Sequence, residues 1–175
     1  MAILKIVEYP ATVLRKKTKL IENFNDPTLD TLISDMAETM YDAPGVGLAA
    51  NQVGISLRLA VIDVTWKEEK EGEYKRTLLV FFNPKILERK ELIPFEEGCL
   101  SLPGLTETVK RYNQVTVQYQ DRKGTVKTLK AEGLLAVALQ HETDHLDGKL
   151  YIDHLSSLKK DLLLKKFKKN TNTPA

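Results

Sequence analysis

The chain has 175 residues, 42% of them hydrophobic, and its 26 basic and 24 acidic side chains leave a formal net charge of +2. This length and composition fit one domain with a substantial core, so we expect a single domain over residues 1–175. The near balance of charge argues against a dedicated nucleic-acid surface over the whole body, and we expect no DNA partner.

The N-terminal stretch MAILKIVEYP interrupts its apolar run with Lys5 and Glu8. It therefore has neither the apolar core of a signal peptide nor the length of a membrane span. Cys99 is the single cysteine, which excludes an intrachain disulfide and gives no sign of an oxidising compartment. We expect a cytoplasmic protein without a membrane partner, whose residues 3–20 form an irregular arm on the body.

A helix is predicted to follow Asp26, because Pro27 suits a first helical position and apolar residues then recur at helical spacing. Those apolar residues are Leu29, Leu32, Ile33, Met36 and Met40. We interpret them as an ordinary core face and not as a cofactor site.

A glycine-rich stretch, APGVGLAANQVG, occupies residues 43–54. It formally matches the dinucleotide fingerprint G-x-G-x-x-G/A, and Asp63 follows at a suitable distance. That fingerprint needs a strand before its glycines and a helix after them, whereas here a helix precedes and a strand, residues 57–64, follows. Nucleotide binding is therefore not expected. Two interpretations stay open: a loop whose backbone approaches a ligand, with Gln52 offering its amide, or a glycine turn in which Gln52 is a surface glutamine.

The middle of the chain is expected to form a solvated loop followed by β-strands. The loop is residues 67–76, where charged side chains surround Gly72. The β-rich runs are residues 77–87, 91–101, 114–120 and 125–130, and the first two are broken by Asn83-Pro84 and by Pro94. The last two runs flank a four-residue turn that contains a glycine, so we predict a hairpin.

Residues 134–148, LLAVALQHETDHLDG, contain the motif H-E-x-x-H at His141, Glu142 and His145. Positions four apart stack on one helix face, so both imidazoles can point at a single metal ion. Glu142 projects about 100° away from His141, where a carboxylate can take a proton from a metal-bound water. The apolar residues 134–139 predict a buried helix, in which an unpartnered histidine pair would be costly. The bare pattern also occurs on inert surface helices, so its context has to confirm it.

A catalytic metal needs a third protein ligand and one open position. The extended pattern H-x-x-G-x-x-H fails, because Tyr151 stands where its third histidine would be. The remaining candidates are Cys99, Asp144, Asp147 and His154. Asp144 should point off the metal face, and His154 lies beyond the glycine expected to end the helix. Cys99 is the softest ligand available, although a lone cysteine is usually a small buried hydrophobe.

A final basic helix is predicted over residues 155–169, capped by Ser156 or Ser157 and followed by a frayed tail at 170–175. Its apolar side is expected to consist of Leu158, Leu162 and Phe167. Lysines surround that side, and two interpretations of them stay open: a solvated face, or contact with a polyanion such as RNA.

Three stretches of the chain resemble, in order and spacing, the signature motifs of bacterial peptide deformylases. These are GVGLAANQ at residues 45–52, EGCLS at 97–101 and QHETDHLDG at 140–148. The opening VEYPATVLR is similar to that family's N-terminal segment. The resemblance implies Cys99, His141 and His145 as metal ligands.

The resemblance also implies roles for residues around the metal. Glu142 would be the general acid and base, while Gln52 and the backbone N–H of Leu100 would hold the substrate oxygen. Substrate-binding residues would be Gly45, Val46, Gly47, Glu97 and Gly98, with Glu97 also anchoring the site from behind. Some members carry an arginine shortly after EGCLS, and residues 102–106 have none, so peptide contacts on that side stay open.

The resemblance implies an α+β fold, with antiparallel β-sheets around a central metal-binding helix and an additional C-terminal helix. It implies a hydrolase that removes the formyl group from the formylmethionine of nascent polypeptides, with a metal-bound water as nucleophile. Fe²⁺ would be the native ion, and Zn²⁺, Ni²⁺ or Co²⁺ could substitute. The basic helix would offer a contact to the ribosome. The alternatives are an inactive relative, or a structural Cys/His₂ zinc module that binds RNA, which would need a fourth protein ligand.

Overall fold

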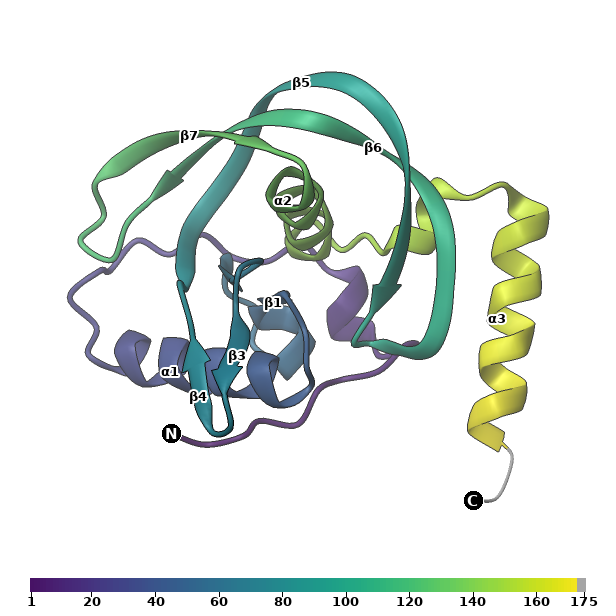
Figure 1. Ribbon diagram of the computed structural model, residues 1–175, viewed down its shortest axis with the longest axis horizontal. Helices are drawn as coiled ribbons and strands as arrows, with labels where there is room; N and C mark the ends of the chain where they lie inside the picture. The colour runs from purple at the N-terminus through teal and green to yellow at the C-terminus, as the bar shows by residue number, and fades with distance from the viewer. Residues whose placement is uncertain (173–175) are drawn as a thin grey trace.

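The computed structural model describes residues 1–172 (Figure 1). Its framework is a five-stranded antiparallel sheet in the order β1-β2-β5-β6-β7. The strands are β1 (Gly47–Ala49), β2 (Leu59–Ile62), β5 (Leu79–Cys99), β6 (Leu102–Gln120) and β7 (Val126–Glu132). The long strands β5 and β6 pair along most of their length and arch over the helix α2 (Leu134–Leu146) (Figure 1). The predicted α+β arrangement around a central helix is confirmed.

Helix α1 (Thr28–Asp42) covers one face of β1 and β2 (Figure 1). Its Met36 and Met40 are fully buried against residues of those strands, which confirms the predicted core face. On the opposite face of β1 and β2, Ala49 and Ala60 pack against Leu146 of α2. Because both faces of these strands are covered, their apolar residues form continuous runs and do not alternate with polar ones.

Residues 67–76 were expected to form a loop, and that expectation is wrong. They contain β3 (Lys67–Lys70) and β4 (Glu73–Lys75), which pair as a separate two-stranded sheet. Gly72 lies in the turn with a φ of +79°, a conformation that glycine adopts without steric cost. A local turn thus allows charge-rich residues to pair as strands.

The two β-rich runs expected at 77–87 and 91–101 are one continuous strand, β5. Asn83 and Glu91 adopt positive φ, and the register with β6 shifts between Phe82 and Lys85. Such irregularities bend a strand without ending it, and a proline is tolerated at them. The predicted hairpin between β6 and β7 is confirmed.

The arm is irregular as expected, apart from the short helical turn η1 (Thr12–Arg15), and a second such turn, η2 (Ala50–Val53), follows β1. Helix α2 ends before Gly148, which has a φ of +76°. A side chain at Gly148 would come within 2.6 Å of the Arg15 carbonyl oxygen, so the arm packs directly on the helix end.

Helix α3 (Ser157–Asn172) follows the short turn η3 (Tyr151–His154) and begins as predicted, with Ser156 Oγ accepting a hydrogen bond from the Lys159 N–H. Its predicted apolar side is wrong in part. Phe167 is buried, but the side chains that flank it on the packed face are Leu163 and Leu164, while Leu158 and Leu162 are exposed.

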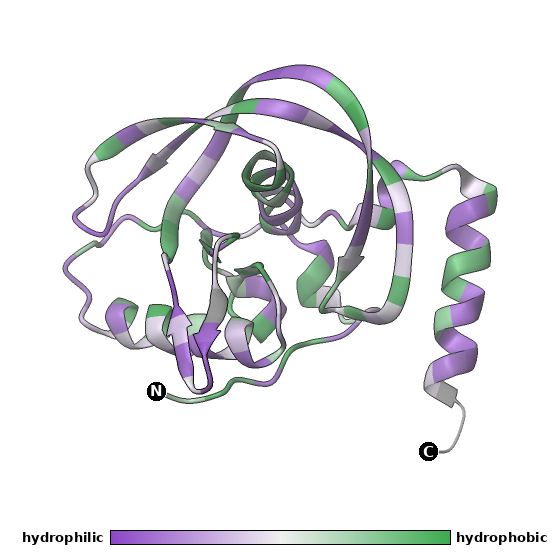
Figure 2. Ribbon diagram, in the orientation of Figure 1, coloured by the Kyte–Doolittle hydropathy of each residue, from purple (hydrophilic) through white to green (hydrophobic). Residues whose placement is uncertain are grey.

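Figure 2 shows α3 as largely hydrophilic with interspersed hydrophobic segments. Residues 170–172 continue this helix, so the predicted fraying does not begin there, and residues 173–175 lie outside the described part of the chain. None of the helices within residues 1–172 has the length and apolar character that a membrane crossing requires.

Candidate active site

A cavity of about 690 Å³ lies between the arm, the loop after α1, the turn joining β5 to β6, and α2. This volume falls within the range of small-ligand sites. Much of the wall is apolar and includes Val46, Leu100, Leu105, Leu134 and Val137. His141 and Glu142 also line it, so the H-E-x-x-H motif faces the cavity.

Three candidate metal ligands from distant parts of the sequence converge here. Cys99 ends β5, while His141 and His145 lie one turn apart on α2. His145 Nε2 lies 3.2 Å from Cys99 Sγ and 3.1 Å from His141 Nε2. Ligands bound about 2.0–2.3 Å from one tetrahedral ion are roughly 3.5 Å apart, so this spacing fits a single ion.

The electrostatics of the three ligands also fit a cation. Burial and the neighbouring His141 hold the pKa of His145 well below its ordinary value, so this imidazole is neutral and can donate a lone pair. Burial also opposes charge on His141, but hydrogen bonds with Cys99 and Glu97 raise the pKa of His141 well above its ordinary value. The Glu97 carboxylate, which helps to hold a proton on His141, would also favour a metal ion in place of that proton.

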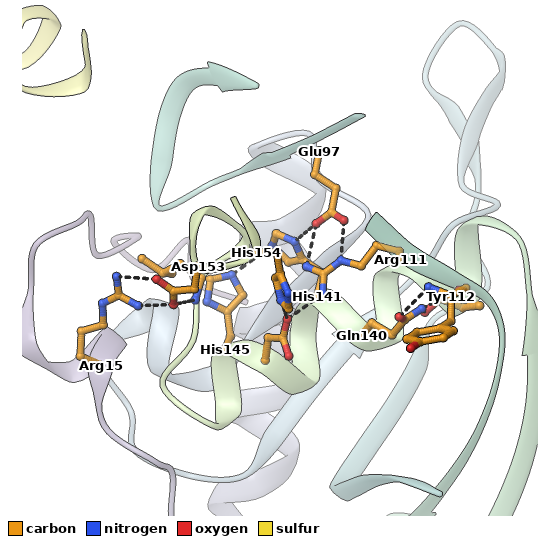
Figure 3. Close-up of polar contacts among 12 residues, drawn as sticks. Arg15, Glu97, Arg111, Tyr112, Gln140, His141, His145, Asp153 and His154 are labelled. Atoms are coloured by element: carbon orange, nitrogen blue, oxygen red, sulfur yellow. Dashed lines mark hydrogen bonds and ion pairs between the residues drawn. The ribbon is translucent and has the colours of Figure 1, made fainter. Parts of the chain in front are cut away.

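A buried ion pair behind the ligands orients His141 (Figure 3). Glu97 Oε1 accepts a hydrogen bond from His141 Nδ1 at 2.7 Å, which leaves Nε2 for a metal. Arg111, on β6, binds the same carboxylate through two nitrogens at 2.6 and 3.0 Å. Burial raises the pKa of Glu97, but the hydrogen bonds from His141 and Arg111 outweigh burial and lower it. Glu97 lines the cavity, yet both of its oxygens are engaged by these two residues, which suits an anchor better than a substrate contact.

Arg111 is the main site residue that the sequence analysis missed. Its Nη1 lies 2.6 Å from Asp144 Oδ2, and His154 Nε2 lies 2.7 Å from that same oxygen (Figure 3). A continuous network therefore connects His141 to the surface. One sequence signal could have identified Arg111. Side chains alternate between the two faces of a strand, so Arg111 shares a face of β6 with the apolar Val109, and both are buried.

The other candidate ligands have different partners within residues 1–172. Asp144 points off the metal face, as predicted, and binds Arg111 and His154. Asp147 forms an ion pair with Arg58 at 2.7 Å. Tyr151 stacks its ring on His141, with 6.3 Å between ring centroids and 22° between planes.

Glu142 is 5% exposed, and its Oε2 has no hydrogen-bond partner in the described structure. Burial raises the pKa of Glu142 to about 7, and the attraction of His141 offsets only part of this effect. A carboxyl group with such a pKa can both accept and return a proton near neutral pH. Gly47 leaves room for it, because a Cβ at that position would lie 2.6 Å from Glu142 Oε1.

Gln52 is 1% exposed and lines the cavity, so the interpretation as a surface glutamine is wrong. Its Oε1 accepts the Ala49 N–H at 3.0 Å, which turns Nε2 toward Cys99 Sγ at 3.7 Å and Ser101 Oγ at 3.2 Å. Leu100 follows Cys99 in the turn between β5 and β6 and also lines the cavity. Two possible donors therefore flank the candidate metal ligands.

The remaining predicted substrate-binding residues, Gly45, Val46, Gly47 and Gly98, all line the cavity. Two further lining residues, Ile6 and Glu8, belong to the arm, to which the sequence analysis gave no function. The arm is held there by backbone hydrogen bonds, including one from Tyr9 N–H to the Ser101 carbonyl at 2.9 Å.

A family model for polypeptide deformylases matches residues 3–161 of this chain. The peptide deformylase of Desulfotalea psychrophila is 53% identical over 97% of both chains, and that of Agrobacterium fabrum is 50% identical over 97% of this chain and 96% of the relative. A crystal structure of the Legionella pneumophila enzyme is 47% identical, with a TM-score of 0.87 over 99% of this chain and 100% of that one. A structure of the Ehrlichia chaffeensis enzyme in complex with actinonin is 39% identical with the same TM-score and coverage.

These similarities extend over nearly the whole chain and include the segments that carry the three motifs. They do not support a non-enzymatic zinc module. The chain belongs to the polypeptide deformylase family of metal-dependent hydrolases.

Proposed function

We propose that this chain hydrolyses the formyl group from the N-terminal formylmethionine of newly made polypeptides and releases formate. The observation that carries the proposal is the convergence of Cys99, His141 and His145 beside a buried Glu142 at an apolar cavity. These three residues would hold one divalent ion, and the ion would supply Lewis-acid activation of water. The cavity beside them leaves access for a substrate.

Glu142 would move the proton in this reaction. It accepts a proton from the attacking water, whose oxygen forms a bond to the formyl carbon. It then delivers the proton to the amine nitrogen as the carbon–nitrogen bond breaks. The products are formate and a free N-terminal amine. A pKa of about 7 suits both transfers, because neither protonation state is strongly favoured near neutral pH.

Gln52 and Leu100 would stabilise the negative charge that develops on the formyl oxygen. The Gln52 amide is fixed by its bond to Ala49, so its Nε2 is already directed at the site and needs no reorientation. Donors arranged in advance are the effective ones for such a charge. The apolar wall, including Val137 and Leu105, suits the unbranched side chain of methionine.

We further propose Fe²⁺ as the native ion, with Zn²⁺, Ni²⁺ or Co²⁺ able to substitute. One thiolate and two imidazoles are acceptable ligands for all four, and the choice of iron rests on the resemblance. Protein prepared with Fe²⁺ without oxygen should be the most active form and should lose activity in air. Formate release at equal metal content tests this, and a zinc form that equals the iron form would refute it.

The test of the reaction is formate release from a formyl-Met tripeptide, with the acetyl-Met tripeptide as matched substrate. Wild-type protein should release formate, lose this activity to a chelator and regain it with metal. Cys99→Ser should lose metal and activity, whereas His154→Gln, which changes a residue outside the ligand set, should keep its metal. Absence of formate release from metal-loaded protein would overturn the proposal and would identify an inactive relative.

We also propose that α3 contacts ribosomal RNA, which would place the enzyme where nascent chains emerge. Its sequence carries six lysines and one aspartate. Lys165, Lys166 and Lys168 are exposed, while Phe167 holds the helix on the body. Phosphate contacts of this kind weaken as salt rises, so salt-sensitive co-sedimentation with ribosomes supports the proposal.

A further inference from the structure

The loop at residues 43–47, here called the groove loop, forms one wall of the cavity. It lies very close to the side chains of two predicted site residues. A Cβ on Gly45 would come within 2.9 Å of Leu100 Cδ1, and one on Gly47 within 2.6 Å of Glu142 Oε1. A shift of the loop by a few tenths of an ångström would therefore change the shape of the groove.

The groove loop is held by hydrogen bonds to its backbone. The Gly45 N–H donates to the Met40 carbonyl at 2.8 Å, and the Asp63 N–H donates to the Val46 carbonyl at 2.8 Å. One side chain also takes part, because Trp66 Nε1 donates to the Gly45 carbonyl at 3.0 Å. Trp66 is half-buried and does not belong to the described cavity lining, so it acts on the loop from outside.

The indole of Trp66 is fixed by the residues around it. Its ring packs edge-on against Tyr41, with 5.5 Å between centroids, and lies 6.4 Å from Tyr74 of β4. The guanidinium of Arg76 lies 4.1 Å from the centre of the Tyr41 ring. Asp63 then binds the Tyr41 hydroxyl at 2.7 Å, so the end of α1 and the base of the β3-β4 hairpin are joined behind the groove loop.

Asp63 is 1% exposed and also accepts the backbone N–H groups of Thr65 at 3.0 Å and Thr77 at 2.7 Å. These residues lie just before and just after the β3-β4 hairpin. Asp63 is the acidic residue that follows the glycine-rich stretch at the distance a nucleotide-binding fingerprint would require. In this structure its carboxylate instead connects Tyr41 with the two ends of the β3-β4 hairpin, next to Trp66.

We infer that Trp66 is a positioning residue: it holds the groove loop, which forms the substrate-facing wall of the active site, in place. The inference rests on the proposed function, because the groove is where the formylated peptide would bind. Within residues 1–172, the hydrogen bond and ring contacts of Trp66 are with Gly45, Tyr41 and Tyr74, and not with Cys99, His141 or Glu142 on β5 and α2. Loss of its hydrogen bond should therefore loosen substrate binding and leave the chemical step in place.

The test is Trp66→Phe, which keeps an aromatic ring and removes the N–H donor. We expect KM for a formyl-Met tripeptide to rise about three- to tenfold, the range that loss of one neutral hydrogen bond gives. The value of kcat should stay within about twofold. Glu73→Gln is the matched control, since it changes an exposed residue of the same hairpin and leaves both the hydrogen bond and the aromatic neighbours of Trp66 in place, and it should leave KM unchanged.

Amide hydrogen exchange supplies a readout that does not depend on activity. Faster exchange at residues 45–47 in Trp66→Phe, but not in Glu73→Gln, is expected if the indole holds the loop. Unchanged KM and unchanged exchange would overturn the inference, and so would a loss of kcat with KM intact. If wild-type protein releases no formate, the proposed function fails instead, and the exchange experiment still decides whether Trp66 positions the loop.

Discussion

The helices α2 and α3 are of similar length, but the protein uses them in opposite ways. Of the 13 residues of α2, nine are buried, because strands arch over one side of it and β1 and β2 cover another (Figure 1). Among the described side chains of α3, only Phe167 is buried. Both helices carry ionisable groups, so the difference lies in their surroundings and not in composition alone.

Burial decides what a charged side chain can do. On α2, Glu142 and His145 have pKa values displaced by burial, and Asp144 is held by Arg111. An ionised group there needs a specific partner, since an unpaired buried charge is costly. Lys165, Lys166 and Lys168 of α3 are exposed, so they stay hydrated and an approaching anion can reach them. Substitutions in and around α2 should therefore have large, specific effects, and those on α3 small effects on the isolated protein.

The largest effect is expected for Glu142→Gln. This change keeps the shape of the side chain but removes the group that would accept the proton, so turnover should fall by ~10² or more. Metal content, measured by elemental analysis, should stay at the wild-type level. Glu132→Gln, at an exposed carboxylate on β7, is the control and should be fully active. Near-normal turnover by Glu142→Gln would refute its assignment as the base.

Arg111→Met should produce the largest loss of stability. It leaves Glu97 and Asp144 without the cation that neutralises them, and breaking such a buried pair costs about 3–5 kcal/mol. Metal affinity should also fall by ~10- to 100-fold, because His141 loses its fixed orientation. Urea denaturation and metal titration measure the two effects. Lys110→Met, one residue away but exposed, should change neither, and an equally mild result for Arg111→Met would contradict the network.

The sequence predicted the metal helix and the β6-β7 hairpin, because both follow from local periodicity and turn residues. The chemistry of its side chain made Cys99 one of several candidate ligands, and only the resemblance selected it, since no local spacing connects residue 99 with α2. Arg111 could not be identified for the same physical reason: its partners Glu97 and Asp144 are brought to it by folding.

Tertiary contacts also overruled two local signals. Strand β5 continues past Pro84 and Pro94 because it is paired with β6, although the turn residues there predicted breaks in the strand. The apolar residues of α3 lie on more than one side of the helix, so periodicity did not select Phe167 and Leu163 as the packed face over Leu158. Packing against the arm and β6 made that choice.

A smaller effect is expected at Asp153, which joins the arm to α3. Figure 3 shows Arg15 bound to Asp153. Burial raises the pKa of Asp153, but hydrogen bonds from Arg15, the Leu150 N–H and Lys160 outweigh burial and lower it to about 2. A depressed carboxyl pKa stabilises the folded state above the ordinary value of 3.8, and this contribution disappears as pH falls through about 2.

Asp153→Asn should therefore lower the free energy of unfolding by ~1 kcal/mol near pH 6, a size typical of partly exposed pairs. The difference from wild type should vanish as the pH approaches 2. Chemical denaturation across this pH range measures it, with the exposed Asp161→Asn on α3 as control. A difference that persists at pH 2 would show that the carboxylate charge is not its source.

The smallest effect on the isolated protein is expected for charge reversal on α3. The triple variant Lys165→Glu, Lys166→Glu, Lys168→Glu should release formate at the wild-type rate, because these side chains are exposed and α3 does not line the cavity. Reversal is preferable to truncation, since Phe167 packs in a cluster with Leu105 and Tyr151, and removing it would disturb the body.

The same variant should lose ribosome co-sedimentation, and the binding of wild-type protein should weaken steeply with salt, as expected for phosphate contacts. Reversal of Lys110, Lys123 and Lys130, which lie on β6, the hairpin turn and β7, is the control with an equal change in net charge. If both triple variants lose binding equally, overall charge and not α3 drives association. If the α3 variant still binds, the exposed lysines of α3 only face solvent. The two helices would then differ in that α2 carries site residues and α3 has no function of its own.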